Sequence, residues 1–301
     1  MEQNEQRVAD KTVEVAKEAI GTTTDKAAAQ EAVDKTLAQQ LAENEQQIYD
    51  RSRQHIEEIE EEVRQTQPLA APKEVIDALV FSYDSDTSPE YHRKAKELAN
   101  VYSHIRRIRG DGNCFYRAVL TAQLERVLYN RTELKRFIEI VKGWRQRLFK
   151  FGFPELTTGD FCDAMDTLMD SIDKGEKTDA MLFDDLNQDG IANYYVAFMR
   201  FITSGFLREN EELYSAFIEG ERNLDQYCKD EVEPMWKESD QIAAVALVNA
   251  IDVPIRIEYM DRSQGEWHHD FYPQTSAPNA VPVLYFLYRP GHYDILYKRE
   301  N

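Results

Sequence analysis

The hydrophobic pattern changes period after Pro254, and this change limits the possible folds more than any other feature of the sequence. Residues 255–259 alternate between apolar and polar side chains, which is the period of two expected for a strand with one buried face. Further extended segments are expected at 267–272 and 281–288, and a last one begins just after residue 290. Strands this close together in sequence predict an antiparallel or mixed sheet near the C-terminus.

Helical spacing predominates before that point. Residues 155–238 carry methionine and aromatic side chains in stripes that predict helices with one buried face. Residues 242–247 are apolar nearly all round, which predicts a central helix that Asp240 caps. Thr132 is the predicted cap of an earlier helix. The fold class is therefore α+β or α/β, with helices backing the sheet.

A short stretch at residues 109–117, RGDGNCFYR, carries the first chemical signal. Asp111 and Gly112 predict a tight turn, and the apolar spacing after them predicts a helix that begins near Cys114. The free N–H groups and the dipole of a helix N-terminus stabilise a thiolate, and the same N–H groups are placed to hold an oxyanion. The alternative is a capped turn followed by an inert buried thiol.

A second signal lies far downstream, where His292 follows a Pro-Gly turn at the start of the last strand. His292 and Asp294 are two residues apart, so both side chains point to the same face of a strand. The carboxylate can then hydrogen-bond one ring nitrogen while the other nitrogen serves as a base. Together with Cys114 as nucleophile, the pair predicts a cysteine hydrolase.

Four separated motifs, GDGNCFYRA, EVEPMWKESD, EYMDR and LYRPGHYDILY, resemble the otubains, the ovarian-tumour (OTU) class of deubiquitinating cysteine proteases. The resemblance runs from about residue 72 to 298, and the long N-terminal region is most similar to the N-terminally extended otubain. It implies an α+β, papain-like fold with a helical subdomain packed on a small mixed or antiparallel C-terminal sheet, and an OTU catalytic domain at 72–301. Gly110 and Trp236 depart from a familiar member, which has proline and cysteine there.

The resemblance also bears on Asp111. This carboxylate lies close enough to Cys114 to be mistaken for the third member of the triad, and otubains have an aspartate at this position too. We interpret Asp111 instead as shaping the loop whose backbone N–H groups, with that of Cys114, form the oxyanion hole.

The resemblance implies a substrate that the residues alone do not. Otubains cleave the isopeptide bond after the C-terminal glycines of ubiquitin, and the extended member prefers lysine-48-linked chains and restrains ubiquitin-conjugating (E2) enzymes without using its cysteine. The expected partners are therefore ubiquitin, polyubiquitin chains and E2 enzymes. Two alternatives stay open: a mainly non-catalytic regulator that binds E2 enzymes and ubiquitin, and a protease for another ubiquitin-like modifier.

Residues 1–71 are expected to be an acidic N-terminal extension whose first part is disordered. An apolar stripe predicts a helix at about 43–66, but its glutamate-rich opposite face cannot support a core alone. A solvated extension and a helix that folds onto a partner are both compatible with this pattern. The resemblance favours the second, with the helix in contact with the proximal ubiquitin and E2 enzymes. The residues expected to bind the proximal ubiquitin are Ile48, Ile56, Ile59 and Val63.

Charge and cysteine content limit the remaining classes. A net charge of −19 disfavours nucleic acid and anionic membrane surfaces as partners. Three scattered cysteines are too few for a disulfide framework or a zinc site, so no metal and no cofactor are expected. No apolar run is long enough to cross a bilayer. The expected compartment is reducing: the cytoplasm, with access to the nucleus left open.

Overall fold

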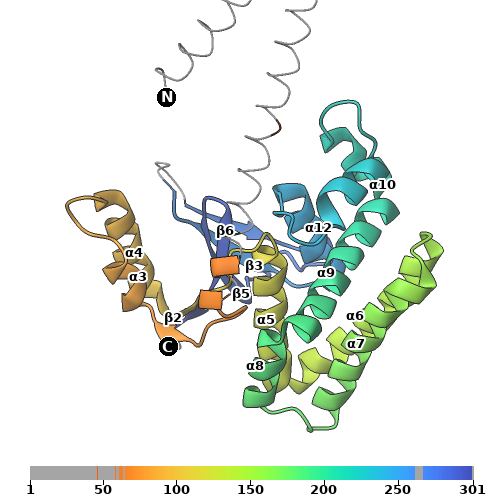
Figure 1. Cartoon of the computed structure of the whole chain (residues 1–301), viewed down its shortest axis with the longest axis horizontal. Coiled ribbons are helices and arrows are strands. Elements are labelled where there is room, and N and C mark those ends of the chain that lie inside the picture. Colours follow the sequence, from red (N-terminus) through yellow and green to blue (C-terminus); the bar gives the residue numbers. More distant parts are fainter. Residues whose placement is uncertain (1–45, 47–57, 59–60, 64, 262–266, 300–301) are drawn as a thin grey trace, which may run out of the picture. The chain divides into compact units, whose positions relative to one another are not determined.

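The computed structural model describes residues 46, 58, 61–63, 65–261 and 267–299, and the chain divides into two compact units, Met1–Glu62 and Val63–Asn301. The second unit (Figure 1) begins upstream of the expected boundary at residue 72. The reason is that Leu69 and Ala70 are buried, and Leu69 accepts a backbone hydrogen bond from Arg109. Within the described residues, no helix is long and apolar enough to cross a membrane.

A single mixed sheet of six strands forms the centre of this unit, in the order β1-β2-β6-β5-β3-β4. Neighbouring strands are antiparallel except β3 and β5, which are parallel. Four strands come from the C-terminal part of the chain, as the alternating pattern predicted, whereas β1 and β2 precede the cysteine loop. The strands are β1 (Glu74–Val75), β2 (Tyr102–Arg106), β3 (Ile255–Tyr259), β4 (His268–Phe271), β5 (Leu284–Arg289) and β6 (His292–Lys298).

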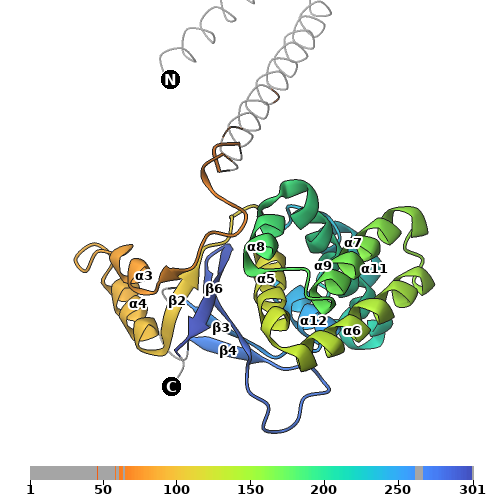
Figure 2. The same cartoon turned by 90° about the horizontal axis from the view of Figure 1, so that it is seen from below.

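The sheet is covered on both faces. Ile295 and Leu296 of β6 point to opposite sides and join two different hydrophobic clusters. The smaller cluster lies under α3 (Asp77–Phe81) and α4 (Pro89–Val101). The larger cluster joins the other face to the helical body, with α5 next to β6 (Figure 2).

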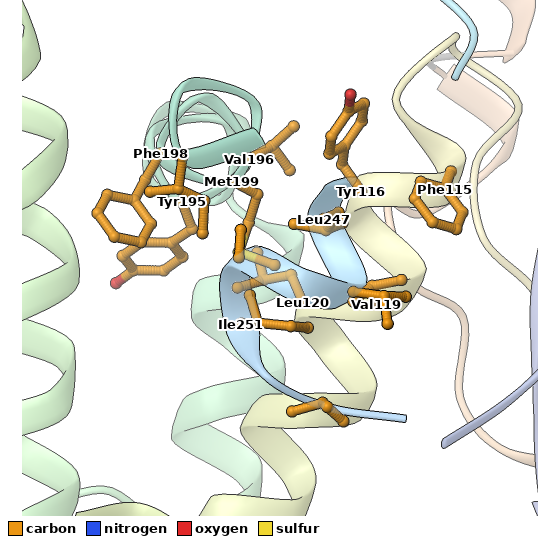
Figure 3. Packing of buried hydrophobic residues seen from close by; sticks show 14 of the residues in the cluster. Phe115, Tyr116, Val119, Leu120, Tyr195, Val196, Phe198, Met199, Leu247 and Ile251 are labelled. Atoms are coloured by element: carbon orange, nitrogen blue, oxygen red, sulfur yellow. The ribbon is translucent and has the colours of Figure 1, made fainter. Parts of the chain in front are cut away.

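Three helices form the middle of the larger cluster. They are α5 (Cys114–Tyr129), α9 (Asp189–Glu209) and α12 (Gln241–Ile251). Their apolar side chains interdigitate in Figure 3, where Leu120 of α5, Met199 of α9 and Leu247 of α12 meet. Because α5 is buried on nearly all sides, the residue at its N-terminus is held in a fixed position.

The remaining helices surround this centre, and the starts of α12 and α6 show how side chains set helix ends. Asp240 caps α12 as predicted, since its side chain accepts the N–H of Ala243. The prediction of Thr132 as a cap was wrong: the side chain of Asn130 accepts the N–H of Glu133, so the cap lies two residues earlier than predicted. These elements are α6 (Arg131–Lys150), α7 (Glu155–Asp173), α8 (Asp179–Asn187), α10 (Glu211–Tyr214), η1 (Ser215–Phe217), α11 (Leu224–Tyr227) and η2 (Cys228–Val232).

Candidate active site

Cys114 is the first residue of α5 and is only 4% exposed. The turn before it requires glycine at position 112 for two reasons. Gly112 has φ of +73°, and a Cβ atom there would lie 2.2 Å from the backbone oxygen of Trp236. The predicted turn and helix start are therefore confirmed, and the turn packs against a distant segment that the motif alone did not indicate.

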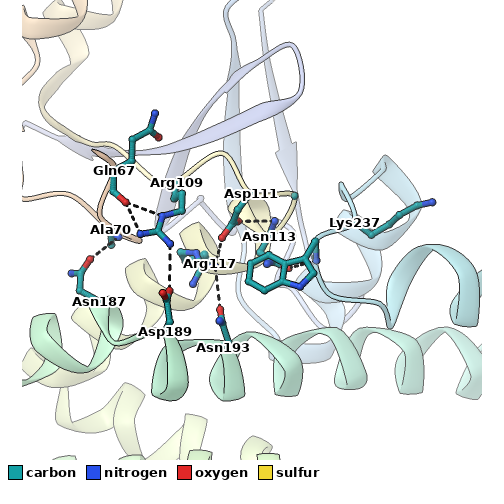
Figure 4. Close-up of polar contacts among 12 residues, drawn as sticks. Gln67, Ala70, Arg109, Asp111, Asn113, Arg117, Asn187, Asp189, Asn193 and Lys237 are labelled. Carbon is teal, nitrogen blue, oxygen red and sulfur yellow. Dashed lines mark hydrogen bonds and ion pairs between the residues drawn. The ribbon is translucent and has the colours of Figure 1, made fainter. Parts of the chain in front are cut away.

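Asp111 holds this turn together. Its Oδ1 atom accepts the backbone N–H of Asn113 at 3.0 Å, and its Oδ2 atom accepts from the buried Arg117 at 2.7 Å (Figure 4). Among the described residues, Asp111 makes no hydrogen bond to His292. This geometry supports the loop-shaping role over a place in the triad.

The predicted histidine and aspartate do meet at the start of β6. The Nε2 atom of His292 lies 2.9 Å from Oδ1 of the fully buried Asp294. Asp294 also accepts the N–H of Ile108 at 3.0 Å and a hydrogen bond from Arg289 at 2.6 Å. Burial alone would raise the pKa of Asp294, but the hydrogen bond from His292 and the nearby positive charges lower it, so the group is a carboxylate.

The pKa of His292 is shifted in the opposite direction to that of Asp294. Burial of the ring disfavours its charged form, yet the hydrogen bonds to Asp294 and Cys114 outweigh burial and raise the pKa of His292 to about 9. The Nδ1 atom faces the cysteine loop, because a Cβ atom on Gly110 would lie 3.4 Å from it. At neutral pH the ring is therefore a cation that donates from Nε2 to Asp294 and presents Nδ1–H on the side of the loop.

Two backbone N–H groups of the loop are left for a substrate. The N–H of Asp111 donates to the carbonyl of Arg109, and that of Asn113 donates to Asp111. Within the described residues, the N–H groups of Gly112 and Cys114 have no acceptor, so they are the donors available to an oxyanion.

Arg200 of α9 was not predicted to be near the site. It is buried and donates to the side-chain oxygen of Asn113 and to the carbonyl of Gly112. The only signal in the sequence is a lone arginine in an apolar helical stripe. That signal marks a buried cation but does not name its partners, because they lie on a loop far away in sequence.

Several predictions concern residues outside this centre. Cys162 and Cys228 are buried, and burial raises the pKa of each to about 11, in keeping with inert thiols. Val63 is half-buried and lines a cavity of about 450 Å³ together with His292. Ile48, Ile56 and Ile59 lie outside the described residues. The described part of the chain has no group of three or more histidine, cysteine, aspartate or glutamate side chains that could hold a metal ion.

A cysteine at the start of a buried helix, facing a histidine that a buried aspartate orients, defines the papain-like class of cysteine hydrolases. Comparison with known proteins identifies the family within this class. The family model for peptidase C65, otubain, matches residues 61–298. A Caenorhabditis elegans protein named ubiquitin thioesterase otubain-like is 42% identical, with 82% of this chain and 87% of the relative covered. Human ubiquitin thioesterase OTUB1 is 39% identical, with 80% and 87% covered.

The structural comparison agrees. The solved complex described as h/ceOTUB1, ubiquitin aldehyde and UBC13~Ub contains a chain with 40% sequence identity and a TM-score of 0.80, and the match covers 84% of this chain and 100% of that one. This chain belongs to the otubain family of cysteine-type deubiquitinases. The predicted α+β, papain-like fold is thereby confirmed.

Proposed function

We propose that this protein hydrolyses isopeptide bonds that follow the C-terminal glycine of ubiquitin, and that it also binds ubiquitin-conjugating enzymes. The observation that carries the proposal is the contact of His292 with both Cys114 and Asp294 in a chain of the otubain family. The preference for lysine-48 linkages rests on the family resemblance.

The geometry assigns a role to each group. The Cys114 thiolate attacks the isopeptide carbonyl, and the oxyanion that forms accepts hydrogen bonds from the N–H groups of Gly112 and Cys114. The His292 cation gives its proton to the leaving lysine amine, which leaves a thioester on Cys114. His292 then takes a proton from water, which attacks the thioester and restores the thiolate. Asp294 keeps the ring oriented throughout.

The first test is a panel of linkage-defined diubiquitins with the intact protein and the Cys114→Ala variant. We expect cleavage of the lysine-48 dimer and complete loss of cleavage in the variant, because the reaction has no other nucleophile. Binding of ubiquitin should persist in the variant, which is the control for folding. Cleavage by Cys114→Ala, or failure of the intact protein to cleave any dimer, would contradict the proposal.

Binding of E2 enzymes is proposed because relatives have been solved with ubiquitin aldehyde and UBC13~Ub or UBCH5B~Ub. In this chain the contacts are proposed to include the apolar stripe of residues 43–66. A protein that acts mainly as a non-catalytic regulator is the second candidate, favoured by the same complexes. To separate the two, transfer of ubiquitin by a charged E2 is measured with Cys114→Ala. Undiminished inhibition combined with no diubiquitin cleavage by the intact protein favours the regulator.

We propose the cytoplasm, with access to the nucleus, as the compartment. The buried catalytic thiol is compatible with a reducing environment. Cell fractionation followed by detection of the protein in each fraction tests this proposal, and recovery in secreted material would contradict it.

A further inference from the structure

Arg200 is a fully buried cation with an unusual set of partners. Besides Asn113 and Gly112, it donates to the carbonyls of Val232 at 2.9 Å and Lys237 at 2.6 Å. All of these acceptors are neutral oxygen atoms. Within the described residues, no carboxylate forms an ion pair with Arg200. A buried guanidinium without a carboxylate partner is rare because of its desolvation cost.

The neighbouring arginines differ in this respect. Arg117 pairs with Asp111 at 2.7 Å, and Arg109 lies 3.3 Å from Asp189 (Figure 4). Each of those charges is matched locally by an opposite charge. The charge of Arg200 is therefore the one near the cysteine loop that the described structure leaves without a carboxylate.

The side-chain amide of Asn113 occupies the position from which a carboxylate could have paired with Arg200. Its Oδ1 atom accepts three hydrogen bonds: from Nε of Arg200 at 3.1 Å, from Nη2 of Arg200 at 2.8 Å, and from the backbone N–H of Trp236 at 3.0 Å. Three donors on one atom fix the orientation of the amide. The Nδ2 atom is buried and has no hydrogen-bond partner. An aspartate at position 113 would accept the same three hydrogen bonds, leave no unpaired N–H and neutralise the guanidinium. The asparagine instead leaves the positive charge of Arg200 unpaired, and its own buried Nδ2–H group has no acceptor.

The positive charge of Arg200 lies close to the atoms on which negative charge develops in the proposed reaction. Asn113 directly precedes Cys114, and negative charge develops on that sulfur and on the carbonyl oxygen held by the loop. In a buried site of low dielectric, a nearby unit charge acts much more strongly than in water. The charged or titratable groups that interact with Arg200 are Tyr116, Asp111, Cys114 and Arg117. His292 and Tyr293 of β6 interact with Cys114 from the other side of the loop.

We propose that Arg200 is a positioning residue of the proposed deubiquitinase reaction: it clamps the cysteine loop to segment 232–237, and its charge, which no carboxylate in the described part of the chain pairs directly because residue 113 is an amide, stabilises the Cys114 thiolate and the oxyanion. Two separate functions follow from this arrangement. The four neutral acceptors supply the clamp, and the missing carboxylate supplies the electrostatic effect. Different substitutions can therefore remove one and leave the other.

The charge is tested with Asn113→Asp, which preserves the acceptor atoms and pairs Arg200. The readout is the pH profile of Cys114 alkylation by iodoacetamide, followed by mass spectrometry of the peptide that contains residue 114. We expect the midpoint of the profile to rise by about one pH unit or more, and kcat on a ubiquitin C-terminal fluorogenic amide to fall about tenfold or more with little change in KM. Asn193→Asp is the matched control, because it adds a carboxylate beside Arg117, 3.4 Å from the present amide oxygen, whose charge is already matched.

The electrostatic part of the proposal would be overturned if Asn113→Asp had the same alkylation midpoint and the same kcat as the intact protein. It would also be overturned if Asn113→Asp and Asn193→Asp shifted the alkylation midpoint equally. Because alkylation needs no ubiquitin, it tests this inference even if diubiquitin is not cleaved and the proposed function fails.

The clamp is tested with Arg200→Lys, which keeps the charge but cannot reach four acceptors. Arg106→Lys is its control, since Arg106 is a buried arginine with hydrogen bonds to Tyr297, Ala71 and Glu125. We expect both variants to lower the thermal midpoint, and only Arg200→Lys to lower kcat by tenfold or more at unchanged KM. Equal kcat in the two variants would overturn the clamp. If Arg200→Lys does not fold, Asn113→Asp still decides the electrostatic part of the proposal.

Discussion

At the scale of single residues, the site depends on how charge is distributed around Asp294. This carboxylate receives hydrogen bonds from His292, Arg289 and the backbone N–H of Ile108, and Arg107 lies 3.5 Å away. Such an environment makes protonation of Asp294 unfavourable and keeps its negative charge beside the imidazole. The consequence is a histidine that is charged at neutral pH.

The raised pKa of His292 predicts a pH dependence of stability. Its stabilisation is fully present below the unfolded value of 6.5 and is lost as the pH rises through about 9. The free energy of unfolding should therefore decline over this range, by at most on the order of 3 kcal/mol for this group. Urea unfolding of the intact protein and of Asp294→Asn at pH 6 and pH 9.5 measures the effect. The decline should be smaller in Asp294→Asn, and equal declines in both proteins would contradict the assignment.

The sequence predicted the His292–Asp294 pair because a strand has a period of two, which places both side chains on one face wherever the strand lies. It could not predict Arg107 or the N–H of Ile108 as further partners of Asp294. Both residues directly follow β2 in the chain, and they reach Asp294 through the pairing of β2 with β6. Strand register is set by the whole sheet, which local patterns do not contain.

At the scale of elements, the N-terminus of α5 is positioned by the segment that lies against it. The carbonyl of Trp236 approaches Gly112, and its N–H binds Asn113. Trp236 itself has φ of +68°, which is uncommon for a residue other than glycine and is a mark of local strain. Sequence alone identified the turn and the helix start, but not this contact, because it depends on where the segment returns in the fold.

Gly112→Ala tests this contact. The substitution combines an unfavourable φ with a clash against a backbone oxygen, so either the loop or segment 232–237 must move. We expect loss of hydrolysis and destabilisation by more than about 1 kcal/mol, the usual cost of a Cβ at positive φ. Gly175→Ala is the control, because Gly175 has the same φ of +73° with no atom within 4 Å of an added Cβ. It should cost about 1 kcal/mol and leave hydrolysis intact. Similar activity of both variants, measured on a ubiquitin fluorogenic amide, would argue against the contact.

At the scale of the whole molecule, the catalytic unit includes the chain from Val63 onward. Leu69 and Ala71 pair with Arg109 and Arg107 through backbone hydrogen bonds, and Arg109 donates to the carbonyl of Gln67. These contacts brace the chain just before the cysteine loop. Composition placed the boundary at 72 because the acidic, aromatic-poor character ends there. The short apolar stretch Leu69-Ala70 is too brief to indicate its own burial.

Two truncations separate these boundaries. Removal of residues 1–62 should leave the thermal midpoint and the hydrolysis of a ubiquitin fluorogenic amide close to those of the full chain, while weakening E2 binding. Removal of residues 1–71 also deletes buried Leu69, worth about 2 kcal/mol, and its hydrogen bonds. At about 2–4 °C per kcal/mol for a chain of this size, the loss of Leu69 alone should lower the midpoint by about 4–8 °C. Equal midpoints for the two truncated proteins would show that residues 63–71 do not brace the unit.

The order of strands in the sheet has a consequence for folding during synthesis of the chain. β6 is the last of the six strands to leave the ribosome, yet it lies between β2 and β5 and carries His292 and Asp294. Until β6 inserts, β2 has no partner on that side and Cys114 lacks its proposed base, His292. If Cys114 and His292 act as proposed, the nascent protein is inactive after Cys114 has been synthesised, and the insertion of β6 both completes the sheet and completes the active site.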